Sequence, residues 1–142
     1  MNSKMKEKSL LIKAKYYVSE IKGISDYQLS IVSEEESSFY RERLSKIMSY
    51  SFNDWTFEIS HPVDVDELIS KALEVFRLSE KFNCSLIFDG SVKINVDVEN
   101  CYYFLKSIFS IHHTYDLTLF FPHRLIHVSD DEYIVKFFDG VI

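Results

Sequence analysis

The chain closes with three strand-like runs separated only by short turns, and this feature restricts the possible folds more than any other. The runs cover residues 116–121, 124–128 and 133–138. The first turn carries Pro122, whose fixed φ suits the second position of a β-turn, and the second turn contains Ser-Asp-Asp-Glu. Because turns this short join antiparallel neighbours, the closing segment predicts a three-stranded meander.

Four segments before the meander have apolar residues at helical spacing. They cover residues 10–21, 33–50, 64–76 and 97–109. The first should end at Gly23, and the second should begin at a capping box formed by Ser33 and Glu36. We expect Asp64 to cap the third helix and Asp97 to cap the fourth. The wide apolar face of the fourth helix should make it the most enclosed of the four.

Strand-like runs separate these helical segments. Residues 27–32 and 55–59 alternate between apolar and polar side chains, as a half-buried strand does. Residues 86–88 and 92–96 flank an Asp-Gly pair, which is typical of a β-hairpin. Together the elements predict an α+β fold, with about four helices packed on one side of a largely antiparallel sheet that ends in the C-terminal meander. The length favours a single domain over residues 1–142.

Cys84 and Cys101 are the only cysteines, too few for a disulfide framework. The basic first residues are not followed by the apolar region of a signal peptide, and no apolar run approaches the roughly 18 residues that cross a bilayer. We therefore expect a cytoplasmic protein with reduced thiols. Cys101 falls on an apolar helix stripe, where a buried thiol is normal. Cys84, at a helix-to-strand junction, is the better candidate for an exposed and reactive thiol.

Charge is divided unevenly along the chain. Residues 1–25 contain six lysines and two glutamates, a net charge of +4, whereas residues 26–142 carry −10. An acidic body repels nucleic acid and anionic membranes, and it speeds encounters with a basic partner. The lysine-rich first helix could lie on a membrane, but the acidic body behind it would be repelled there. We therefore expect a basic protein partner, with no direct binding to nucleic acid or membrane.

No pattern of residues predicts a catalytic or metal site. His112 and His113 precede a strand, while His123 and His127 lie at a turn and in a strand, separated by roughly 13 Å. One metal ion cannot bridge that distance, so solvated or hydrogen-bonded histidines are expected. His61 lies among carboxylates that favour its protonated form, which is a poor general base. We expect no cofactor and no enzymatic activity. A small hydrolase or metal-dependent enzyme is the second alternative to the function inferred below.

Acidic residues gather at residues 34–36, 54–67 and 130–132, and aromatic side chains accompany the last two groups. Protein interfaces favour aromatic anchors surrounded by complementary charge, which speeds association and fixes the register of the partners. Solvated faces and turns are the alternative explanation for any one cluster. The partner-binding residues predicted on this basis are Asp54, Trp55, Glu58, Asp64, Asp66, Glu67, Asp130, Asp131, Glu132 and Tyr133.

A small, acidic, aromatic-rich and cysteine-poor α+β protein of this kind resembles the immunity proteins of bacterial polymorphic and contact-dependent toxin systems. The resemblance covers the chain in overall character and is greatest in the closing segment, residues 116–138. Immunity proteins of this kind share no motif, so no functional residue is carried over. The resemblance implies that the acidic face occludes the basic, often nuclease, active site of a cognate toxin.

An acidic secretion chaperone or adaptor is the alternative function. Such proteins have a similar size and charge, and they usually dimerise through an apolar helix. An immunity protein is instead expected to be a monomer or a weak homodimer. A neighbouring toxin gene would favour immunity, and a neighbouring secreted effector would favour the chaperone.

Overall fold

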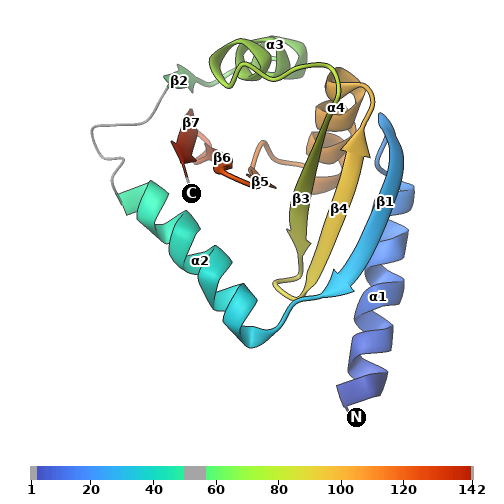
Figure 1. Cartoon of the computed structure of the whole chain (residues 1–142). Helices are drawn as coiled ribbons and strands as arrows, with labels where there is room; N and C mark the ends of the chain where they lie inside the picture. The colour runs from blue at the N-terminus through green and yellow to red at the C-terminus, as the bar shows by residue number, and fades with distance from the viewer. Residues whose placement is uncertain (1–2, 50–56, 142) are drawn as a thin grey trace.

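The computed structural model describes residues 3–49 and 57–141. These residues form four helices and seven strands (Figure 1), so the expected α+β class is confirmed. The helices are α1 (Ser3–Ser19), α2 (Glu34–Ser49), α3 (Val65–Val75) and α4 (Cys101–His112). The strands are β1 (Ile24–Ile31), β2 (Phe57–Ser60), β3 (Phe82–Phe88), β4 (Val92–Val98), β5 (Leu117–Phe121), β6 (Arg124–Asp130) and β7 (Ile134–Val141).

The seven described strands join one antiparallel sheet with the order β1-β4-β3-β5-β6-β7-β2. The expected hairpin is β3–β4, where Asp89 and Gly90 have φ values of 53° and 69°. A hairpin turn of type I′ requires positive φ at both central positions. The expected meander is β5–β6–β7. The remaining strands, β1 and β2, form the two edges of the sheet.

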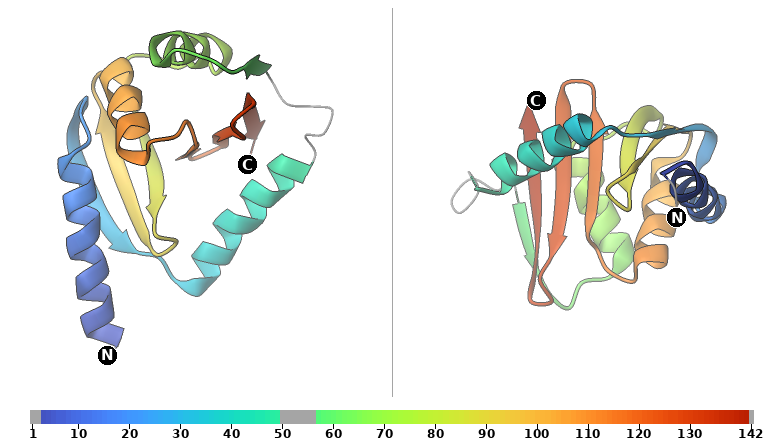
Figure 2. Two further views of the ribbon diagram at one scale, coloured as in Figure 1. Left: turned by 180° about the vertical axis from the view of Figure 1, so that it is seen from behind. Right: turned by 90° about the horizontal axis from the view of Figure 1, so that it is seen from below.

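Helices α1, α3 and α4 cover one face of the sheet and form the main core with it (Figure 2). Of the described helices, α4 buries five side chains, compared with two for α1 and three for α3. The expectation that α4 is the most enclosed helix is therefore confirmed. Alternate residues of β4, including Val92, Ile94 and Val96, are fully buried on this face.

Helix α2 lies on the opposite face, across β5, β6 and β7 (Figure 2), so the expectation that all helices share one side is wrong. The ring of Tyr40 packs against Phe120 with 4.7 Å between centroids. Ile47 occupies the space where a Cβ on Gly140 would stand, so glycine lets the helix approach β7. Helical periodicity reveals an apolar stripe but not which face of a sheet the stripe covers.

The Ser33 half of the expected capping box and the Asp64 cap are confirmed, whereas α1 ends at Ser19, before the expected stop at Gly23. Ser33 Oγ accepts a hydrogen bond from the backbone N–H of Glu36 at 3.1 Å. Asp64 accepts from the N–H of Asp66 at 3.1 Å and caps α3. Gly23, with φ +72°, follows α1, and a Cβ there would collide with the backbone at the start of α4. Each position therefore has the side chain that its local geometry requires.

Asp97 does not cap α4, contrary to expectation. Asn100 is the cap, because its side chain accepts a hydrogen bond from the N–H of Tyr103 at 3.1 Å. Asp97 stays in β4, which pairs with β1 on one side and with β3 on the other as far as Val98. Pairing on both sides thus extends the strand past the point where the local pattern predicts a helix.

Candidate functional site

The structure brings the two expected acidic clusters onto one surface. The pairing of β2 with β7 places the chain after β2 beside the β6–β7 turn. The backbone N–H of His61 donates to the carbonyl oxygen of Tyr133 at 2.8 Å, and Nε2 of His61 lies 2.8 Å from Oδ1 of Asp130. Residues 61–64 therefore lie beside residues 130–133, and Asp66 and Glu67 follow in the first turn of α3. The acidic surface so formed consists of Asp64, Asp66, Glu67, Asp130, Asp131, Glu132 and Tyr133.

Three of the expected partner-binding residues are not part of the acidic surface. Asp54 and Trp55 lie outside the described residues. Glu58 is exposed in β2 and lies directly opposite Lys136 of β7. Opposite charges at such a position stabilise a strand pair, so Glu58 has a role within the sheet.

Tyr115 connects the two halves of the acidic surface. Its ring stacks on His61 with 6.1 Å between centroids, and its hydroxyl donates to the carbonyl oxygen of Val63 at 3.1 Å. Burial raises the pKa of Tyr115, and the nearby carboxylates of Asp64 and Asp130 raise it further. One aromatic ring is thus close to an acidic residue from each cluster.

The protein itself holds several of these carboxylates in place. Asp66 accepts a hydrogen bond from the Tyr102 hydroxyl at 2.5 Å and lies 3.6 Å from Nζ of Lys106. Asp131 accepts from two backbone N–H groups of the β6–β7 turn, at 2.6 and 3.0 Å. The Tyr102 hydroxyl is the main cause that lowers the pKa of Asp66, and the turn amides lower that of Asp131. Both side chains therefore remain ionised at neutral pH.

Of the carboxylates in the acidic surface, that of Asp130 makes the most hydrogen bonds. Besides facing His61, it accepts hydrogen bonds from the Thr114 hydroxyl at 3.3 Å and from the N–H groups of Tyr115 and Glu132 at 3.2 and 3.1 Å. Burial acts to raise the pKa of Asp130, but His61 and the backbone donors outweigh it and lower the pKa. Asp130 thus carries a fixed negative charge.

The other side chains of the acidic surface project outward. Glu67 and Glu132 are exposed, and neither side chain makes a hydrogen bond or ion pair with another residue of the described ranges. Tyr133 is 77% exposed at the β6–β7 turn. The acidic surface therefore combines fixed carboxylates, adaptable carboxylates and one exposed ring.

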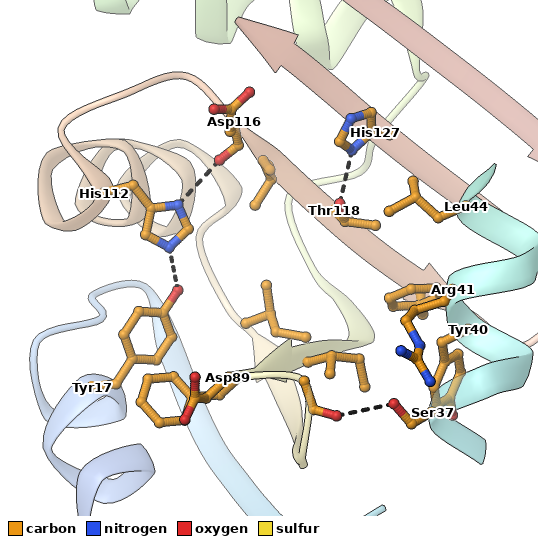
Figure 3. Close-up of a pocket in the computed structure, with 16 residues that line it drawn as sticks. Tyr17, Ser37, Tyr40, Arg41, Leu44, Asp89, His112, Asp116, Thr118 and His127 are labelled. Carbon is orange, nitrogen blue, oxygen red and sulfur yellow. Dashed lines mark hydrogen bonds between the residues drawn. The ribbon is translucent and has the colours of Figure 1, made fainter. Parts of the chain in front are cut away.

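A second candidate site, which sequence reasoning missed, is a cleft within the sheet (Figure 3). Strands β3 and β5 share one residue pair, Ser85 with Phe120, and their pairing ends there. The opening between them is a cavity of about 520 Å³, which we call the β3–β5 cleft. Helix α2 lines one side of it, and Tyr17 of α1 and His112 of α4 line the other.

A hydrogen-bonded chain lies on the α1 side of the cleft. The Tyr17 hydroxyl is 2.7 Å from Nε2 of His112, whose Nδ1 is 3.1 Å from the carbonyl oxygen of Asp116. A carbonyl only accepts, so Nδ1 of His112 carries the proton of its contact with Asp116. Burial raises the pKa of Tyr17 to about 12, so its hydroxyl stays protonated at neutral pH.

The α2 side of the cleft contains a second histidine and one cation. Nδ1 of His127 lies 2.8 Å from the Thr118 hydroxyl, and burial lowers the pKa of His127 despite the opposing charge of Asp116. Arg41 of α2 also lines the cleft. No carboxylate within the described ranges lies within 4.0 Å of its guanidinium. His112 and His127 are thus hydrogen bonded, as expected.

Both cysteines are buried and unpaired. The expectation that Cys84 is exposed is wrong, because Cys84 lies in β3 and points into the main core. Burial raises the pKa of both thiols, that of Cys101 to about 12, and such thiols are unreactive. The described residues contain no group of three His, Cys, Asp or Glu side chains placed to hold a metal. None of the described helices has the length and apolar character needed to span a bilayer.

The function of this chain has to be inferred from its own residues and geometry. Comparison with protein-family models, with curated proteins and with solved structures finds no match to it.

Proposed function

We propose that this protein binds a basic bacterial toxin domain through the acidic surface and neutralises it by occluding its active site in the cytoplasm. The observation that carries the proposal is the proximity of residues 61–64 to residues 130–133, which results from β2–β7 pairing and the contact between His61 and Asp130. The resemblance of the chain to immunity proteins supports a toxin as the partner.

The acidic surface has the physical properties that such binding requires. Asp66, Asp130 and Asp131 are already fixed by hydrogen bonds, so binding would not have to order them. Glu67 and Glu132 can turn toward lysines or arginines of the partner and speed the encounter. Tyr133 can bury its exposed ring as an aromatic anchor.

Capture of the partner from the source organism, followed by an assay of its toxicity, tests the proposal. The wild-type protein should retain a toxin domain more strongly at low than at high salt, because salt screens exposed charge pairs. The bound toxin should be inactive. A captured protein that keeps its toxicity, or capture that is insensitive to salt, would contradict the proposal.

A pair of double variants locates the binding surface. Replacing Glu67 and Glu132 by Lys should weaken toxin binding by at least about tenfold, since two attractive charges become repulsive. Replacing the exposed Glu20 and Glu42 by Lys makes the same change in net charge away from the acidic surface. This control variant should bind the toxin with an affinity closer to that of the wild type. Equal losses of affinity in the two double variants would refute the assignment of the site.

An acidic secretion chaperone or adaptor is the second candidate, and one observation favours it. Met5, Ile12 and Tyr16 of α1 are 59%, 51% and 73% exposed and follow one stripe of the helix. A dimeric chaperone would bury such a stripe against a second copy. Sedimentation equilibrium separates the candidates: a stable dimer that Ile12→Ser with Tyr16→Ser disrupts favours the chaperone, and a monomer favours immunity.

A further inference from the structure

The β3–β5 cleft interrupts the sheet at a place where pairing could continue. An unbroken antiparallel ladder would extend from Ser85 and Phe120 to Ile87 and Thr118. Instead, Ile87 and Thr118 line the cavity. Its volume of about 520 Å³ falls within the roughly 300–1,000 Å³ of small-molecule sites. We propose that the β3–β5 cleft binds a small, largely apolar carboxylate.

The walls of the cleft suit a flat apolar body. An aromatic pair lies on each side of the opening: Tyr17 with Phe88 at 5.2 Å between centroids, and Tyr40 with Phe120 at 4.7 Å. Leucine and isoleucine side chains of α2, β3 and β5 line the space between these pairs. Burial of an apolar ligand against such walls provides most of the binding free energy.

Arg41 selects a negatively charged group on that ligand. Its guanidinium donates a long hydrogen bond of 3.4 Å to Ser38, and the described carboxylates all lie beyond 4.0 Å. A guanidinium binds a carboxylate through two parallel N–H donors. Two carboxylates also line the cleft: Asp89, exposed at the hairpin turn, and Asp116, whose oxygens accept hydrogen bonds from the Thr114 hydroxyl and the Asp130 N–H. Their charges disfavour a ligand with two negative charges. The cleft is therefore suited to a monoanion.

Titration with 2-naphthoate and with the neutral analogue 2-naphthamide tests the proposal. Calorimetry should show saturable binding of 2-naphthoate to the wild-type protein, with amide chemical-shift changes in residues 86–90 and 117–120. Arg41→Gln should weaken 2-naphthoate binding by at least about tenfold, because the charged pair is lost. The same variant should leave the weaker binding of 2-naphthamide within about twofold of the wild-type value.

Arg43→Gln is the matched control. It removes the same charge from the same helix, but Arg43 lies over the ring of Phe39, 4.9 Å from its centroid, and does not line the cleft. Equal weakening by the Arg41 and Arg43 variants, or no saturable binding of 2-naphthoate, would overturn the proposal. Shift changes confined to the acidic surface would also overturn it. Ile87→Phe should fill the cleft and abolish binding of both probes. If the Ile87→Phe protein fails to fold, the comparison of Arg41→Gln with Arg43→Gln still tests the proposal.

Discussion

The side chain of Asp130 links the acidic surface to the end of strand β6 through its contacts with His61 and the backbone. It lies 2.8 Å from His61 and accepts two backbone hydrogen bonds at the end of β6. Asp130→Asn keeps the shape but removes the charge, so we expect the free energy of unfolding at pH 7 to fall by about 1–3 kcal/mol. Urea denaturation measures this change. Glu132→Gln, on the same turn, should change the free energy by less than about 0.5 kcal/mol.

The same residue should make stability depend on pH. The pKa of Asp130 in the folded protein lies below its ordinary value of 3.8, so the unfolded chain binds more protons around that pH. The stabilisation is therefore present above pH 3.8 and is lost as the pH falls through the folded-state pKa. The stability difference between the wild type and Asp130→Asn should shrink as the pH falls from neutral to below 3.8. A difference that stays constant over this range would contradict the pairing with His61.

At the scale of elements, the start of α4 offers a direct test of which residue caps it. Asn100 accepts from the third amide of the helix, so Asn100→Ala should lower the free energy of unfolding by about 1 kcal/mol. Asp97 is exposed and accepts a hydrogen bond from Asn83 at 2.8 Å across the strand pair. Asp97→Ala should therefore lower the free energy of unfolding by less, about 0.5 kcal/mol. Chemical denaturation of the two variants distinguishes a cap at Asn100 from one at Asp97.

Elements with their own end signals could be predicted from the sequence, and elements ordered by distant partners could not. The cap at Asp64, the Asp89–Gly90 turn and the closing meander depend on neighbouring residues, so local patterns identify them. Asp97 presents the same local pattern as Asp64, but pairing on both sides keeps it in a strand.

The candidate sites divide in the same way. The acidic residues near Asp130 are visible in the sequence, but the contact with His61 joins positions 69 residues apart. No local pattern marks the end of pairing between two strands, so Ile87 and Thr118 resemble ordinary strand residues although both line the β3–β5 cleft. Prediction from sequence therefore found one candidate site in outline and missed the other.

At the scale of the whole molecule, the sheet separates a densely packed layer from a lightly packed one. Helices α1, α3 and α4 share the main core, and α4 alone buries five side chains. None of the described side chains of α2 is buried. Because buried apolar contacts set the free energy of local opening, the two layers should differ in local stability.

Amide hydrogen exchange should therefore be faster in α2 than in α4. Gly140→Ala would place a Cβ against Ile47, so it should speed exchange in α2 and leave α4 unchanged. Because α2 forms one wall of the β3–β5 cleft, bound 2-naphthoate should slow exchange in α2. Equal exchange rates in the two helices would mean that both layers open as one cooperative unit.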